Sequence, residues 1–225
     1  MGVGGALAGA AMDKARLKSM LKGRTPEQQQ AIKYFYGSGG CLAKKVSDSE
    51  YESLVMAKAK SFDVKKKALD KIGLDESQVN EVAPVHFEDY CFDKSDSKDL
   101  QTRRGDDNLW RSSAYQITWI FFSSTQVYVY QYTFNMMDDG KKEKTEEYFY
   151  KDVTNFNTTS DTVEGKWLKF GGCMGTKITE ERENLETNRF QLSAMGDKFY
   201  CALKQNDYTE KAIQGMKAKL REKKG

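Results

Sequence analysis

The feature that most constrains this fold is a change of hydrophobic period near Pro84. Before it, apolar residues recur at helical spacing, and after it they alternate with polar residues. The alternation is clearest in 114–122 and 126–136, which a short polar link at 123–125 joins. Two such segments predict a β-hairpin of long strands. We therefore predict an α+β chain with a helical N-terminal region at 1–83 and an antiparallel β-domain at 84–225.

Helix start signals divide the first region. Thr25 with Gln28, and Ser47 with Glu50, have the spacing of capping boxes, in which two side chains satisfy the free amides of a first helical turn. Ser61 is the expected cap of a further helix that ends before Gly73. The predicted helices span 6–21, 26–36, 47–60 and 62–72.

The β-domain is predicted to contain about seven strands and to end in one amphipathic helix. Asp207 and Glu210 form an Asp version of the capping box, and the helix after them carries a single apolar stripe (Ala212, Ile213, Met216 and Leu220). Such a stripe needs a sheet or barrel opening to cover it. A polar stretch at 93–108 lacks alternation, and a charged run at 179–186 is expected to be exposed. The predicted strands span 114–122, 126–136, 145–150, 153–159, 163–170, 189–194 and 198–204, and 85–92 can form another.

Consecutive hairpins followed by one capped helix resemble a pleckstrin-homology-like (PH-like) domain. The resemblance rests on the 115–134 hairpin, the 146–153 segment, the 189–203 hairpin and the 208–221 helix, and the chain looks like uncharacterised bacterial proteins with such a domain. It implies an antiparallel PH-like barrel or sandwich closed by the C-terminal helix. Such domains bind phosphoinositides, peptides or other proteins, so the fold alone does not define the ligand.

Lipid-binding members of this family carry lysine and arginine between their first two strands. The resemblance therefore points to the basic residues of the 93–111 loop as a candidate ligand or lipid site. Five aspartates in the same stretch offset their charge. The candidates are Lys94, Lys98, Arg103, Arg104 and Arg111.

A row of tyrosines is the second candidate surface. Tyr128, Tyr130 and Tyr132 share one face of the 126–136 segment with Phe134. An exposed row would stack bases or grip a peptide. A covered row would form core beneath the N-terminal helices, and the absence of interleaved arginines favours this alternative.

No catalytic or metal site is predicted. His86 is the only histidine, and the four cysteines are far apart (Cys41, Cys91, Cys173 and Cys201). Structural zinc requires clustered Cys and His ligands, and no glycine-rich phosphate motif is present. We expect reduced thiols, no cofactor and a protein that is not an enzyme.

The sequence thus favours a non-catalytic cytoplasmic module that binds a protein or peptide. The alternative is a peripheral membrane protein that contacts anionic lipid through its basic helices and the 93–111 loop. A net charge of +3 over 225 residues gives no reason to expect nucleic-acid binding. Self-association into a homo-oligomer stays open.

Overall fold

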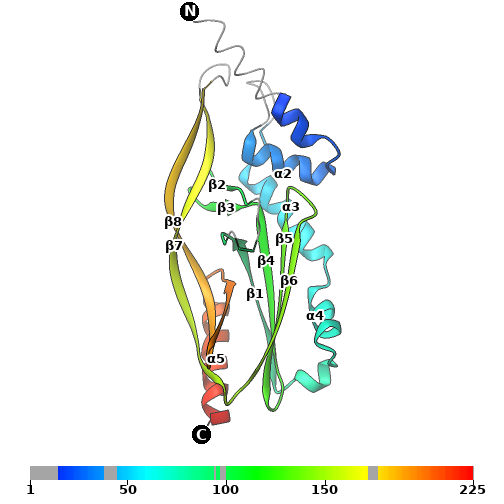
Figure 1. Ribbon diagram of the computed structural model, residues 1–225, viewed down its shortest axis with the longest axis vertical. Coiled ribbons are helices and arrows are strands. Elements are labelled where there is room, and N and C mark those ends of the chain that lie inside the picture. The colour runs from blue at the N-terminus through cyan, green and yellow to red at the C-terminus, as the bar shows by residue number, and fades with distance from the viewer. Residues whose placement is uncertain (1–14, 38–44, 94, 97–99, 172–176, 225) are drawn as a thin grey trace, which may run out of the picture.

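The computed structural model describes residues 15–37, 45–93, 95–96, 100–171 and 177–224. These residues form three layers, which Figure 1 shows side by side. N-terminal helices cover one face of a four-stranded sheet. A long β-hairpin, a further strand and the C-terminal helix cover the other face. The predicted α+β class is confirmed.

The helical layer follows its capping signals. It comprises a helical segment at 15–21, α2 (Pro26–Tyr36), α3 (Asp48–Ser61), α4 (Val64–Ile72) and a 3-10 turn at Glu76–Val79. The capping boxes of Thr25 with Gln28 and of Ser47 with Glu50 are both present. Ser61 instead ends α3, and the side chain of Asp63 caps α4. The part of the predicted first helix before residue 15 lies outside the described residues.

The central sheet is antiparallel and has the strand order β1-β4-β5-β6. Its strands are β1 (Val82–Cys91), β4 (Ala114–Phe122), β5 (Gln126–Asn135) and β6 (Lys141–Phe149). The predicted β4–β5 hairpin is confirmed, and Trp119 lies opposite Tyr130 in its register. Because side chains alternate across a strand, β4 and β5 supply both cores of the molecule.

Each face of this sheet has its own hydrophobic core. On one face, Tyr115, Phe121 and Tyr130 pack under Ile32 and Val55 of the helices. The opposite face packs against the last strands and the C-terminal helix. It contributes Phe87, Ile120, Phe122, Val127 and Val129 to a cluster with Phe156, Phe190, Leu192, Phe199, Ile213, Met216 and Leu220.

The third layer is β7 (Val153–Gly171), β8 (Lys177–Ala194) and β9 (Asp197–Ala202), in that order, with α5 (Asp207–Lys224) beside it. A short ribbon of β2 (Thr102–Arg104) and β3 (Trp110–Ser112) is separate. The predicted closed barrel is wrong, since among the described strands neither β6 nor β1 pairs with this layer. The predicted stripe of α5 does cover the sheets, because Ile213, Met216 and Leu220 are buried.

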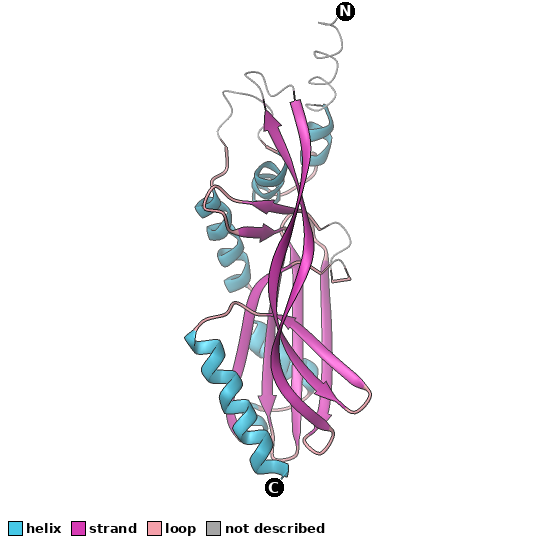
Figure 2. Ribbon diagram, turned by 90° about the vertical axis from the view of Figure 1, so that its left-hand side faces the viewer, coloured by secondary structure: helices cyan, strands magenta, loops and turns pink. Residues whose placement is uncertain are grey.

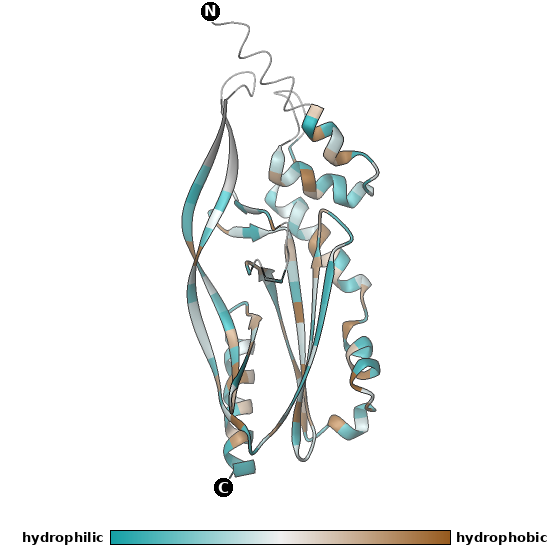
Figure 3. Cartoon of the chain, in the orientation of Figure 1, coloured by the Kyte–Doolittle hydropathy of each residue, from teal (hydrophilic) through white to brown (hydrophobic). Residues whose placement is uncertain are grey.

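The β7–β8 hairpin is longer than the sequence predicted. The strands predicted at 153–159 and 163–170 are one continuous strand. The charged run at 179–186 lies within β8, where Arg182, Asn184 and Glu186 are exposed as expected. In Figure 3 this hairpin is mostly hydrophilic. Polar composition hid its β-structure, since only a few of its positions pack on a core.

The hairpin packs against the rest of the molecule with one face near one end and with the opposite face near the other end. Phe156 and Leu192, which pair, enter the core of the central sheet. Farther along, Gly165 and Leu185 lie against the Trp110 ring, although they occupy the other face of the same ribbon. Two-stranded ribbons twist strongly, and Figures 1 and 2 show the two strands crossing as they rise.

Candidate functional site

The structure places the predicted basic loop around β2 and β3. Lys94 and Lys98 lie outside the described residues. The Arg103 guanidinium sits 4.4 Å from the Tyr34 ring centre and donates to the Tyr34 carbonyl. Arg104 donates to both carboxylate oxygens of Glu183 at 2.8 Å. These arginines contact other parts of the chain and do not gather on one open surface.

Arg111 is the most enclosed of the three arginines, with its side chain 2% exposed. Its Nη2 donates to Asp107 and to Glu52, each at 2.6 Å. The Arg111 guanidinium holds the pKa of Asp107 well below its usual range, and these bonds raise the pKa of Arg111. The sequence did not indicate this role, because Glu52 is 59 residues away. Arg111 therefore ties α3 to the β2–β3 ribbon.

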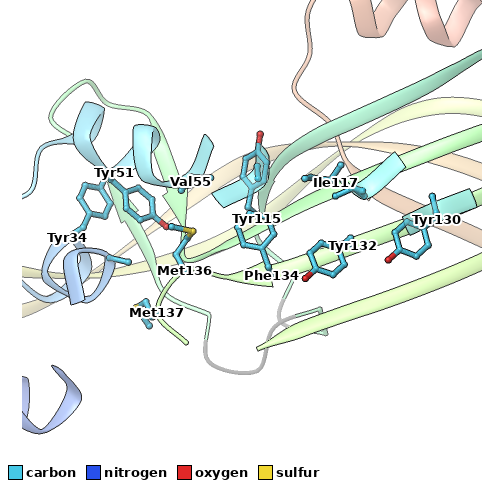
Figure 4. Packing of buried hydrophobic residues seen from close by; sticks show 14 of the residues in the cluster. Tyr34, Tyr51, Val55, Tyr115, Ile117, Tyr130, Tyr132, Phe134, Met136 and Met137 are labelled. Atoms are coloured by element: carbon cyan, nitrogen blue, oxygen red, sulfur yellow. The ribbon is translucent and has the colours of Figure 1, made fainter. Parts of the chain in front are cut away.

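The tyrosine row is covered. Tyr128, Tyr130 and Tyr132 are 8%, 0% and 3% exposed. Figure 4 shows Tyr130 and Tyr132 in the packed cluster with Phe134. The hydroxyl of Tyr130 donates to Glu143 at 3.0 Å, and Lys67 of α4 lies over the Tyr132 ring at 4.4 Å. These rings belong to the helix–sheet core and leave no face for a ligand.

His86 lies on β1 among aromatic rings. Its ring stacks on Trp119 at 4.9 Å, and its Nδ1 lies 3.5 Å from the hydroxyl of Tyr208 on α5. No serine, cysteine or carboxylate is hydrogen-bonded to it in the described structure. The contacts fit a residue that holds α5 against the edge of β1.

A small polar pocket lies between the central sheet and the last strands. Its volume is about 30 Å³, which is room for about two water molecules. The Gln116 amide nitrogen donates to Asp96 at 3.1 Å and to Thr133 at 3.0 Å, and its oxygen accepts from the Ala202 amide at 2.7 Å. Arg189 reaches Asp93 at 3.3 Å. The pocket is thus a hydrogen-bonded seam between layers rather than a substrate cavity.

The side chains around this pocket are not activated for catalysis. Burial raises the pKa of Cys91 and of Cys201 to about 12, so both thiols stay protonated at neutral pH. Asp96 accepts from Lys142 at 2.8 Å and from the Gln116 side-chain amide at 3.1 Å. These groups can hold water and fix the register of the two layers. They provide no activated nucleophile.

An open strand edge is the stronger candidate for recognition. The amide and the carbonyl of Lys166 both bond to the Thr102 hydroxyl, at 2.9 and 2.8 Å. These groups therefore point away from β8, and so do those of every second residue before Lys166. Ser160 and Thr162 fall in this set, and their outward backbone groups have no partner among the described residues.

The surroundings limit the length of this open section. The C-terminal helix α5 contacts β7 and β1, and Figure 2 shows it beside the lower part of the hairpin. Above, Thr102 occupies the edge at Lys166. The section around Ser160–Thr162 lies between these two covers. We call it the β7 edge.

Two other strand edges, those of β6 and β1, are protected. The outer edge of β6 carries Lys141, Lys142, Lys144, Glu146 and Glu147, and such charges block the addition of another strand. On β1, the hydroxyl of Tyr208 lies 3.5 Å from the His86 amide. The β7 edge contains one charged residue, Asp161, whose carboxylate pairs with Arg189 of β8 at 3.5 Å. It therefore carries fewer charges than the edge of β6 and is better suited to pair with an incoming strand.

In the part of the chain that the structure describes, no group of His, Cys, Asp and Glu side chains is arranged to hold a metal ion. None of its helices combines the length and hydropathy that crossing a bilayer requires. Comparisons with protein-family models, curated proteins and solved structures find no match.

Proposed function

We propose that this protein is a non-catalytic binding module that recognises an extended segment of a partner protein by strand addition to the β7 edge. The observation that carries the proposal is the outward backbone of Ser160 and Thr162 in a strand stretch with few charges. Strand addition obtains affinity from main-chain hydrogen bonds, each contributing about 0.5–1.5 kcal/mol. A short open section supports moderate, reversible binding.

Two further features support the wider proposal. Consecutive hairpins that end in a helix packed across two sheets agree with a distant PH-like relationship, and PH-like domains include peptide binders. The free thiols of Cys91 and Cys201 support a cytoplasmic location, where thiols are kept reduced.

The test is selection of binding peptides from a displayed random library with the full chain as bait. We expect enriched peptides to be β-prone and their binding to be lost in Thr162→Pro, which removes an outward amide without breaking a bond to β8. Thr162→Val is the matched control, because it keeps the amide and the β-branched shape.

A second variant guards against distortion of the strand by proline. Ser160→Lys with Thr162→Lys adds edge charges of the kind that protect β6. Circular dichroism confirms folding of each variant. Failure to enrich any peptide, or equal binding by wild type and both edge variants, contradicts the proposal.

A further inference from the structure

Residues 15–33 form one of the basic segments of the molecule. This segment has five basic residues (Arg16, Lys18, Lys22, Arg24 and Lys33) and one acidic residue (Glu27), a net charge of +4. The whole chain has 36 basic and 33 acidic residues, so the remainder has 31 and 32. Outside this segment the protein is close to neutral.

The basic side chains of the segment are not neutralised within the fold. Arg16, Lys18, Lys22 and Arg24 are exposed, and none forms an ion pair in the described structure. Some lysines elsewhere are paired within the fold, as Lys65 is with Glu76 and Lys67 with Glu143 at 3.4 Å. We call residues 15–33 the basic end.

The apolar side of the basic end is already in use. Leu17, Met20 and Leu21 pack against the core beneath the helices. The segment shows no exposed large hydrophobic side chain, so its outer surface is cationic without an inserting face. Arg16 and Lys18 lie on the helical segment at 15–21, where a rise of about 1.5 Å per residue separates them by about 3 Å along the axis, well within a Debye length of roughly 10 Å. Their attraction for an anionic surface therefore adds up.

We propose that the basic end is a docking surface for a membrane that contains anionic phospholipids. The segment lies at one end of the molecule, where Figure 1 draws it in dark blue. Single-stranded nucleic acid is a poorer fit, because the exposed side offers no aromatic ring for base stacking. This inference is independent of the proposed peptide binding.

Vesicle flotation with the full chain tests the inference. We expect binding to vesicles with 30% phosphatidylserine, no binding to pure phosphatidylcholine, and release by roughly 0.5 M salt. Replacing Arg16, Lys18, Lys22 and Arg24 by Glu should weaken binding at least about tenfold.

The C-terminal helix offers a matched control. Replacing Lys211, Lys217, Arg221 and Lys224 by Glu changes the charge equally on another basic helix, and it should leave binding within about threefold. The inference is overturned by wild-type protein that does not float, by equal loss in both variants, or by salt-sensitive binding to duplex DNA without vesicle binding. Retained binding in the first variant also overturns it.

Discussion

Asp89 shows how one half-buried carboxyl group makes stability depend on pH. It lies on β1 opposite Gln116, and burial raises its pKa to about 6, although the Tyr90 amide and Lys204 favour its charged form. The folded state therefore binds a proton more tightly than the unfolded state. The protonated Asp89 carboxyl group therefore contributes stability that is fully present below about pH 4 and is lost as the pH rises through about 6.

We expect Asp89→Asn to be more stable than wild type at pH 7.5 and similar to it near pH 4. A two-unit shift corresponds to about 3 kcal/mol for a fully buried group, and partial exposure reduces this to about 1–2 kcal/mol. Urea denaturation of both proteins at the two pH values measures the difference. A constant difference across this range would show that the charge of Asp89 does not cause it.

At the residue level, contacts between residues close in sequence could be predicted, and contacts between distant residues could not. The reciprocal bonds of Thr25 with Gln28 span three residues, so a short pattern suffices to predict them. The partners of Arg111 and Arg103 lie on other elements, and their positions depend on how the layers pack. The arginines of the basic 93–111 loop thus make contacts within the protein and do not form a ligand site.

At the scale of elements, the exact cap of α5 and the full length of β7 could not be predicted. The helix α5 begins at Asp207 as predicted, but Asp207 is not its cap, because Asn206 accepts from the Thr209 amide at 3.0 Å. Asp and Asn are both good caps, so neighbouring candidates compete. The continuous β7 was missed for another reason, because its inward face changes along the strand and no single alternation describes it.

Replacing either of two glycines by alanine should change stability, with a loss in the hairpin and a gain in the helix. A Cβ at Gly165 would lie 2.6 Å from the Trp110 ring and 2.8 Å from Leu185, so Gly165→Ala should push the hairpin from β3 and cost about 1–3 kcal/mol. Gly215 lies inside α5 with nothing within 4 Å, so Gly215→Ala should add about 0.5–1 kcal/mol.

Thermal and urea denaturation of both variants measure these effects. The emission of Trp110 should change in the first variant and not in the second. Equal stability of the two variants would mean that the hairpin is free to move away from the ring.

For the whole molecule, the division at residue 84 does not separate independent cores. Strand β1 already begins at Val82, and the helices cover Tyr115, Ile117, Phe121 and Tyr130. A fragment of residues 84–225 should expose this face and aggregate. Co-expression of residues 1–83 should restore a soluble complex.

Gel filtration of the fragment with and without residues 1–83 checks this expectation. A soluble, monomeric fragment with cooperative unfolding would show that the sheet needs no helical cover. The period change near Pro84 thus predicted where secondary structure changes, while the cores depend on both sides of that point.

The change of face along β7–β8 also restricts how this protein can evolve. Phe156 and Gly165 lie on opposite faces of the ribbon, yet both contact the body of the molecule. Inserting one residue pair in register, one residue in each strand, would reverse every side chain beyond that point and turn Leu185 away from Trp110. Inserting two residues in each strand would restore the alternation. Insertions and deletions in this hairpin should therefore involve an even number of residues in each strand, because both of its ends pack against the body of the molecule.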